Sequence, residues 1–322
     1  MTPKQRQLDR WLLAALQKKR SARAVDLIHQ GADVSALSAG GDTALYTALA
    51  YDCFAAVVPL LEAGADPNVP NGAGTYPLHI AAEYGGDAAP QLLEALIAHG
   101  ARIDVRDAEG ATAIFLAGKG ASTETVHTLL RHGANIRDRN NELDTPLTFA
   151  CCWGMADRAA MLLDAGIDLD AQDNLGMTAL QWASKDGHAS TVALLLRHGA
   201  RVDIANHWGH TALMYAAGQG SSVCVASLLD AGADPLARDD NGQTALDCAL
   251  RYAGRDLGES LLADAVARTD AESHGELSVE RLMTPDGEAA VQVRRRSEHG
   301  VEWTRELCDG FARVVHLLQS YR

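Results

Sequence analysis

Residues 178–200 read TALQWASKDGHASTVALLLRHGA and contain two features that recur along the chain. The first is a threonine before an alanine-rich run, which predicts a short helix with small side chains that can pack closely on a neighbour. The second is a leucine-rich run in which Val192, Leu195 and Leu196 share one helical face. Gly199 follows, and glycine readily ends a helix in the left-handed conformation that disfavours other residues. The stretch therefore predicts a helix-turn-helix unit.

The glycine that ends the second helix recurs at almost constant spacing. Successive steps are 33, 36, 33, 33, 33 and 33 residues. The alanine-rich runs that start at positions 43, 76, 112, 145, 178, 211 and 244 keep the same phase. Two marks in fixed phase define one repeated unit. The three extra residues fall within residues 85–91 and predict a longer loop between the two helices of that repeat. The glycines are Gly31, Gly64, Gly100, Gly133, Gly166, Gly199 and Gly232.

The spacing, the YPLHIA run that starts at Tyr76 and the LLEAGAD run that starts at Leu60 resemble the marks of the ankyrin-repeat family. The resemblance implies an all-α fold, an ankyrin-repeat solenoid of helix-turn-helix units with hairpin fingers along one edge. It also implies that the first helices line a concave face. Such repeats serve mainly as protein-binding surfaces, so the resemblance favours a scaffold over an enzyme.

The boundaries follow from where the marks begin and fade. Residues 1–37 lack the threonine mark, and we expect them to form an N-terminal capping unit. Ala265 stands where the last glycine is due, so the final repeat is degenerate at its end. The expected repeats occupy residues 38–265, as 38–70, 71–106, 107–139, 140–172, 173–205, 206–238 and 239–265.

Residues 266–322 match no repeat and predict a small C-terminal appendage. Alternation at Val291 and Val293, with a turn signal at Pro285-Asp286-Gly287, predicts a β-hairpin within residues 275–297. From about Thr304, apolar residues at positions 307, 311, 314, 318 and 321 predict one face of a helix. We expect the hairpin and helix to pack on the last repeat or to self-associate, which gives a monomer or a tail-mediated dimer.

The charge is unevenly distributed. The net charge is −14, but residues 1–30 hold seven basic and two acidic residues, and residues 31–265 hold 13 and 30. The acidic body argues against nucleic acid as a partner and favours a protein with a basic surface. The apolar run at residues 11–16 is too short for a signal peptide or a membrane span. Scattered cysteines without metal-ligand spacing predict reduced thiols in a cytoplasmic protein, and five lysines against 23 arginines favour a bacterial source.

Catalytic, cofactor and metal motifs were sought, and none has the required spacing. The GKGAS run at residues 118–122 lacks the frame of a phosphate-binding loop. His207 and His210 would need a third ligand to hold zinc, and Asp239 or Asp240 of the next finger could only approach them. Asp239 and Asp240 are also unsuited to catalysis, because adjacent residues on a turn do not face a common pocket. We therefore predict no catalytic residue, no cofactor and no metal site.

Exposed aromatic residues are the strongest functional signal. The residue eight places after the threonine is Tyr51, Tyr84, Trp153 or Tyr252 in four repeats, although aromatic residues make up only 5% of the chain. Rings in register are typical anchors of an interface. The alternative is that each ring packs on its neighbouring repeat, whereas Phe149, Trp182 and Tyr215, four places after the threonine, are expected in the core. Asp186 holds the place eight after the threonine in the fifth repeat. With it and the residues at and beside the finger tips, the predicted partner-binding set is Tyr51, Tyr84, Glu109, Glu142, Trp153, Asp186, His207, Trp208, His210 and Tyr252.

The sequence thus predicts a non-catalytic protein-protein interaction scaffold, adaptor or enzyme inhibitor. The alternative is a substrate-recruiting subunit or secreted effector whose C-terminal tail engages a second component. Leu143 adds a structural prediction, because it stands where the other finger tips carry glycine. Either that turn has another shape or a leucine is held at positive φ.

Overall fold

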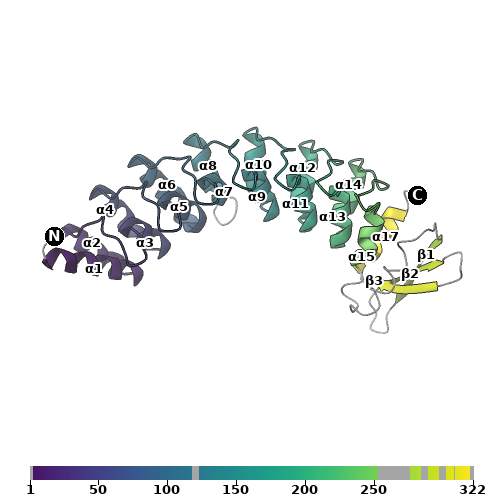
Figure 1. The fold of residues 1–322 in the computed structure, drawn as a ribbon, viewed down its shortest axis with the longest axis horizontal. Helices are drawn as coiled ribbons and strands as arrows, with labels where there is room; N and C mark the ends of the chain where they lie inside the picture. The colour runs from purple at the N-terminus through teal and green to yellow at the C-terminus, as the bar shows by residue number, and fades with distance from the viewer. Residues whose placement is uncertain are drawn as a thin grey trace. The chain divides into compact units, whose positions relative to one another are not determined.

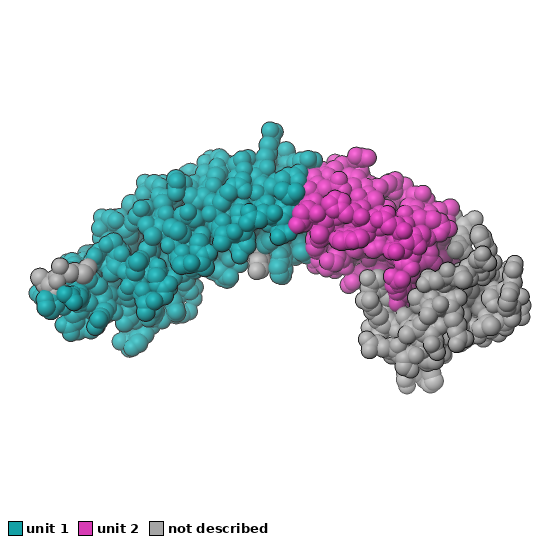
Figure 2. Space-filling view, in the orientation of Figure 1, with its two compact units in different colours: residues 1–168 teal, residues 169–322 magenta. Residues whose placement is uncertain are grey.

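The computed structural model describes residues 3–117, 123–252, 276–283, 289–296, 302–307 and 309–319. Two compact units divide the chain, unit 1 with residues 1–168 and unit 2 with residues 169–322 (Figure 2). Both contain pairs of antiparallel helices in which first helices contact first helices and second helices contact second helices (Figure 1). No helix within the described ranges is both long and apolar enough to cross a membrane.

Unit 1 begins with the helix pair of the expected capping unit and continues through four repeats. Its first helices are α1 (Pro3–Gln17), α3 (Ala44–Ala50), α5 (Pro77–Tyr84), α7 (Ala113–Ala117) and α9 (Pro146–Cys152). Its second helices are α2 (Ser21–His29), α4 (Val57–Glu62), α6 (Ala89–Ala98), α8 (Thr123–Arg131) and α10 (Ala156–Asp164). The short 3-10 turns η1 (Phe54–Ala56) and η2 (Gly86–Ala88) precede α4 and α6.

The three extra residues of the second repeat do not simply lengthen its loop. Helix α5 has eight residues and α6 has ten, where α9 has seven and α10 has nine. The loop between α5 and α6 has four residues, against three between α9 and α10 but six between α3 and α4. The expectation of a loop longer than its neighbours is therefore wrong against the first repeat, because α6 and η2 take up much of the extra length.

Unit 2 contains the first helices α11 (Ala179–Lys185), α13 (Ala212–Gln219) and α15 (Ala245–Tyr252), and the second helices α12 (Ala189–Arg197) and α14 (Ser222–Asp230). Helix α17 (Asp309–Gln319) contacts both α14 and α15. In the preceding pairs, a second helix contacts its own first helix and the second helix before it. Helix α17 thus makes the contacts of a second helix for α15, and its Val314, Val315 and Leu318 are buried.

An antiparallel sheet precedes α17 in the chain. Its strands β1 (Glu276–Met283), β2 (Ala289–Arg296) and β3 (Glu302–Leu307) are ordered β1-β2-β3. Val293 pairs with Val279 of β1 and with Arg305 of β3, so the predicted hairpin is joined by a third strand. The expectation of a helix from Thr304 is wrong: Thr304 pairs with Arg294 in the sheet, and the helix begins at Asp309.

The threonine mark works as a helix cap. The Oγ1 atoms of Thr43 and Thr145 accept the N–H three residues later, both at 3.1 Å. This bond satisfies one of the donors that a helix leaves without a partner at its first turn. The following alanines, Ala44 and Ala113, are fully buried where first helices meet. Where it caps, the threonine therefore fixes the start of a first helix, and the small alanine allows the row to pack closely. The third repeat differs, because Thr112 Oγ1 is buried and has no hydrogen-bond partner among the described residues.

A finger is the hairpin turn that precedes each first helix, and the fingers are built on one plan. The first residue of each finger is Ser, Asn or Asp, and its side-chain oxygen accepts N–H groups from within the turn. Neighbouring fingers are joined by backbone bonds such as Asn141 N–H to Glu109 C=O at 2.9 Å. The seven fingers are residues 38–42, 71–75, 107–111, 140–144, 173–177, 206–210 and 239–243.

Candidate protein-binding site

Three of the predicted rings lie at the ends of first helices in unit 1. Tyr51 and Trp153 follow the last residues of α3 and α9, and Tyr84 is the last residue of α5. The rings are 41%, 47% and 60% exposed for Tyr51, Trp153 and Tyr84, respectively. They are not absorbed into the core, although large aromatic side chains bury most of their surface when packing allows. The same position thus presents a ring to solvent in the first, second and fourth repeats.

Carboxylates accompany the tyrosines of unit 1. A hydrogen bond to Glu83 raises the pKa of the Tyr84 hydroxyl, and the charge of Glu83 acts in the same direction. Burial raises the pKa of Tyr46, and the carboxylates of Asp42 and Glu83 add to that effect. Tyr46 is half-buried on α3, and sequence reasoning did not select it. Aromatic faces beside carboxylates favour cationic side chains of a partner.

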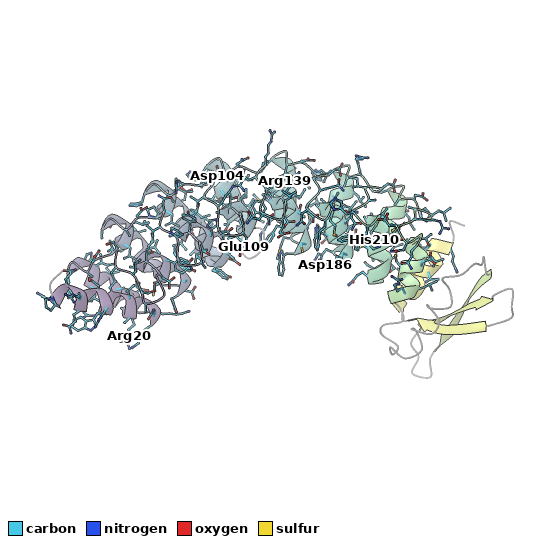
Figure 3. The ribbon with its side chains drawn as sticks, viewed as in Figure 1. Arg20, Asp104, Glu109, Arg139, Asp186 and His210 are labelled. Carbon is cyan, nitrogen blue, oxygen red and sulfur yellow. The ribbon has the colours of Figure 1, made fainter. Side chains whose placement is uncertain are left out.

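The third and fourth fingers place two more predicted residues on the surface of unit 1. Glu109 and Glu142 are exposed, and the backbone of Glu109 accepts the N–H of Asn141 (Figure 3). Arg106 braces this part of the unit, because its guanidinium donates to the C=O of Arg139 at 2.6 Å and pairs with Asp138 at 3.1 Å. The two glutamates therefore stand on fingers that are tied to each other.

The three rings of the sixth finger differ in their surroundings: His207 and Trp208 are exposed, and His210 is partly buried. Asn206 Oδ1 accepts the N–H groups of Trp208 at 3.0 Å and His210 at 2.9 Å, and Asn206 Nδ2 donates to the Tyr215 hydroxyl at 2.7 Å. Trp208, held at the tip by this frame, is 47% exposed. His207 lies over the preceding finger, because a Cβ added to Gly176 would lie 2.7 Å from its ring.

His210 connects the sixth finger to the seventh. The Nε2 of His210 (Figure 3) lies 3.0 Å from Oδ2 of Asp239. The side chain of Asp239 is fully buried. Burial alone would raise the pKa of the Asp239 carboxyl, but the N–H groups of Gln243 and Asn241 and the His210 ring outweigh it and lower that pKa. The His210 ring also packs edge-on against Tyr215, with 5.4 Å between centroids. His210 is therefore partly buried in a structural pair.

Half-buried aromatic residues line the space between first helices and fingers. Phe149, Trp182 and Tyr215 are only partly buried, so the expectation that they belong to the core is wrong. Trp182 Nε1 donates to Asp173 Oδ2 at 2.8 Å, and Lys185 Nζ lies 4.2 Å from the centroid of the Trp182 ring. The sequence contained a sign of this partial burial. The buried residues Leu147 and Leu180 lie two places before Phe149 and Trp182, and residues two apart do not share a helix face.

Of the two remaining predicted residues, the structure describes the side chain of Asp186 but not that of Tyr252. Asp186 follows the last residue of α11 and is exposed (Figure 3). Tyr252 is the last residue of α15, and its side chain lies outside the described residues, as does the GKGAS run at residues 118–122. Asp186 and the sixth finger belong to unit 2, whereas Tyr51, Tyr84 and Trp153 belong to unit 1. Each unit thus has its own set of predicted residues.

The cysteine thiols and the possible metal-ligating side chains were compared with what chemistry or metal binding would require. Burial raises the pKa of the Cys151 and Cys224 thiols, and it raises that of Cys248 to about 11, so these thiols are poor nucleophiles at neutral pH. Among the described residues, no group of three or more His, Cys, Asp or Glu side chains is placed to hold a metal ion.

Comparison with known proteins gives one consistent family. A model of ankyrin repeats in three copies matches residues 78–173 and 180–272, and a model of ankyrin repeats in many copies matches residues 153–196. The crystal structure of the human ASB11 ankyrin repeat domain is 28% identical, with a TM-score of 0.61 over 70% of this chain and 98% of that domain. It is one of 542 matching chains of known structure, so the likeness alone selects no partner. No curated protein sequence matches the chain.

Proposed function

Because the chain belongs to the ankyrin-repeat family, whose repeats generally mediate protein-protein interaction, we propose that it is a non-catalytic adaptor or enzyme inhibitor. It binds a protein with a basic surface through the first-helix ends and the fingers. The observation that carries the proposal is the exposure of Tyr51, Tyr84, Trp153 and Trp208, which ranges from 41% to 60%. Ring anchors of this kind dominate the binding energy of many interfaces.

The charge around the rings selects the chemistry of the partner. Glu109 and Glu142 are exposed on fingers of unit 1, and Asp186 is exposed at the end of a first helix of unit 2. Exposed carboxylates attract a basic surface over a distance of about 8 Å at physiological ionic strength. The Lys185 ammonium already makes a cation–π contact with the half-buried Trp182 ring, and we propose the same type of contact for the partner.

Affinity capture with the full chain, followed by binding measurements on the captured partner, tests the ring surface. Trp153→Ala and Trp208→Ala should each weaken binding about tenfold or more, because truncating a central interface Trp commonly costs about 2 kcal/mol. Both side chains are about half exposed, so the melting temperature should not change. Val223→Ala is the matched control, since Val223 is 61% exposed on a second helix.

Glu109→Gln separates the long-range attraction by carboxylates from the short-range binding by rings. This variant should slow association and reduce its dependence on salt, with little change in the dissociation rate. Normal binding by both Trp variants would contradict the proposal. Loss of binding only in variants that unfold would also contradict it, because the rings would then be structural.

A second candidate function is favoured by the sheet β1–β3, which belongs to no helix pair. In that case the chain is a substrate-recruiting subunit or a secreted effector, and the tail engages a second component. Removing the tail would also remove α17 from its contacts with α14 and α15, so truncation confuses binding with stability. The double variant Arg294→Glu, Arg296→Glu changes β2 alone. Loss of a captured partner in this variant, with the Trp variants unaffected, would favour the second candidate.

The proposed setting is the cytoplasm of a bacterium, without a cofactor and with the chain as a monomer or a tail-mediated dimer. Free thiols at Cys53, Cys151, Cys152, Cys224 and Cys248 support a reducing compartment. Sedimentation of the full chain and of the Arg294→Glu, Arg296→Glu variant would distinguish the two oligomeric states.

A further inference from the structure

The N-terminal end of unit 1 has the opposite charge to the rest of the chain. Its basic side chains are exposed, and within the part of the chain that the structure describes they make no ion pair or side-chain hydrogen bond. Lys19 is different, because it pairs with Asp52 at 2.7 Å. The unpaired basic residues are Lys4, Arg6, Arg10, Lys18, Arg20 (Figure 3) and Arg23.

Trp11 lies among these charges at a position that is buried in other repeats. One repeat length later, Ala44 is 0% exposed, and the corresponding Ala212 and Ala245 are each 1% exposed. Those alanines lie on first helices that pack against the preceding first helix. Trp11 is 48% exposed. A capping unit needs a polar outer face, which explains the lysines and arginines but not a large exposed ring.

Trp11 forms a stripe with two of the lysines. Lys4, Trp11 and Lys18 are seven residues apart, which is close to two helical turns, so they lie nearly in line and about 10 Å apart. Lys18 follows α1 directly, and its N–H donates to Ala14 C=O at 3.2 Å, which continues the helical turn. The buried side of α1 adjoins the stripe, because Leu8 and Ala15, three residues before and four after Trp11, are buried. Its far edge is marked by Asp9, which is 5% exposed and accepts the N–H of Asp33. We call Lys4, Trp11 and Lys18 the Trp11 stripe.

We propose that the Trp11 stripe docks an acidic amphipathic helix of another protein. An apolar residue of that helix packs on the Trp11 ring, and carboxylates about two turns before and after it pair with Lys4 and Lys18. Two helices that pack nearly parallel or antiparallel can place residues with the same seven-residue spacing opposite one another. Trp is also the residue type most enriched at binding hot spots.

The charge distribution favours a short acidic helix over a nucleic acid or an anionic membrane. Residues 1–30 carry a formal charge of +5 (seven basic minus two acidic), but residues 31–265 carry −17 (13 basic minus 30 acidic). An extended polyanion that reached past the capping pair would be repelled by the acidic body. A helix of about 20 residues would contact the capping pair alone.

This surface does not rest on the proposed function, although the two surfaces adjoin: Lys18 stands one repeat length before Tyr51, and Lys19 pairs with Asp52, the neighbour of Tyr51, at 2.7 Å. The finger and first-helix surface favours a basic partner, whereas the Trp11 stripe favours an acidic one. Two surfaces of opposite charge allow the chain to hold two different proteins.

The test uses the full chain and a labelled helical peptide of 21 residues as the probe. The peptide carries Glu, Leu and Glu at seven-residue spacing on one face and alanine, glutamine and further glutamates elsewhere. A scrambled peptide of the same composition is its control, and binding is followed by fluorescence anisotropy. We expect the patterned peptide to bind more tightly than the scrambled one. Trp11→Ala should weaken that binding about tenfold.

Two double variants separate the stripe from net charge. Lys4→Glu, Lys18→Glu should abolish binding of the patterned peptide. Arg197→Glu, Arg201→Glu makes the same change in charge at exposed positions of unit 2 and should leave binding within about twofold once salt screens long-range effects. A melting curve for each variant excludes unfolding, and the charge variants retain the test if Trp11→Ala is unstable.

Three results would overturn the proposal. The first is equal binding of the patterned and scrambled peptides, or no binding of either. The second is unchanged binding by a folded Trp11→Ala variant. The third is tighter binding of a single-stranded oligonucleotide or of phosphatidylserine vesicles, lost in the same variants, which would assign the stripe to a nucleic acid or a membrane.

Discussion

The fourth and sixth fingers share one hydrogen-bond frame but differ at the tip. Asn140 Oδ1 accepts the N–H groups of Glu142 at 3.0 Å and Asp144 at 2.8 Å, just as Asn206 Oδ1 accepts those of Trp208 and His210. Leu143 of the fourth finger has φ of 62°, and Gly209 of the sixth has φ of 76°.

The comparison shows that the first residue of the finger, and not the glycine, sets the shape of the turn. The side chain of Asn140 collects the same bonds whether or not a glycine follows, so the backbone reaches positive φ even with leucine. A leucine is strained in that conformation by about 1–2 kcal/mol. The second reason for glycine is space, because a Cβ at Gly209 would lie 2.8 Å from the backbone N of Asp240.

Gly209→Leu should have the largest effect, because it combines both reasons. The strained φ costs about 1–2 kcal/mol, and overpacking against the seventh finger adds about 1–3 kcal/mol. Gly242→Leu is the matched control: its φ is 73°, but a Cβ there would meet nothing within 4 Å. Chemical denaturation should therefore show Gly209→Leu to be less stable than Gly242→Leu. Equal losses would mean that the neighbouring finger yields and that only the dihedral angle matters.

Asn206→Ala should have the next largest effect, and it tests the frame itself. The variant loses two bonds to backbone N–H groups and leaves the half-buried Tyr215 hydroxyl without its donor, for a loss of about 2–3 kcal/mol. Asn140→Ala should cost less, because the Asn140 Nδ2 donates only to the partly exposed Asp144 carboxylate. Thermal unfolding of the two variants measures the difference. A larger loss at Asn140 would contradict the role given to Tyr215.

The regular parts of these fingers could be predicted from the sequence. The 33-residue spacing located every finger, and the missing glycine predicted that Leu143 is either at positive φ or in another turn; the structure has it at positive φ. Local patterns are sufficient here because threonine, alanine and glycine act on neighbours within four residues.

Contacts that join distant residues could not be predicted in this way. His210 contacts Asp239, which is 29 residues later, whereas the sequence indicated only that Asp239 or Asp240 of the next finger could approach His207 and His210. Strand β3 forms because residues 302–307 pair with β2, although their apolar spacing continues that of the following helix. The half-buried state of Trp182 likewise depends on Asp173, nine residues earlier in the finger, which accepts the indole N–H at 2.8 Å.

Asp239→Asn tests whether charge strengthens the pair between the sixth and seventh fingers. The amide keeps an oxygen for the backbone N–H groups, as Asn206 does in its own finger, but it lacks the charge that faces His210. We expect a loss of about 1–2 kcal/mol at neutral pH.

The pH dependence has a definite sign. The pKa of Asp239 in the folded protein lies below its ordinary value of 3.8, so its stabilising effect is complete above about pH 5. The effect is lost as the pH falls below 3.8 and through the folded value. The difference between wild type and Asp239→Asn should therefore shrink below about pH 4 in urea unfolding. A difference that stays constant down to pH 3 would show that shape, and not charge, is responsible.

Leu143→Gly should have the smallest effect and the opposite sign. Glycine relieves the strain of φ at 62°, but its unfolded chain has more freedom to lose, so the net gain is about 1 kcal/mol. Leu143 is 47% exposed, and little burial is lost with the side chain. The melting temperature should rise by a few degrees, and Leu143→Ala, which keeps a Cβ at the same φ, should not gain. A fall in melting temperature for Leu143→Gly would show that the leucine side chain contributes more by its contacts than its backbone strain costs. A stable variant that no longer binds the captured partner would instead add Leu143 to the binding surface of the fourth finger.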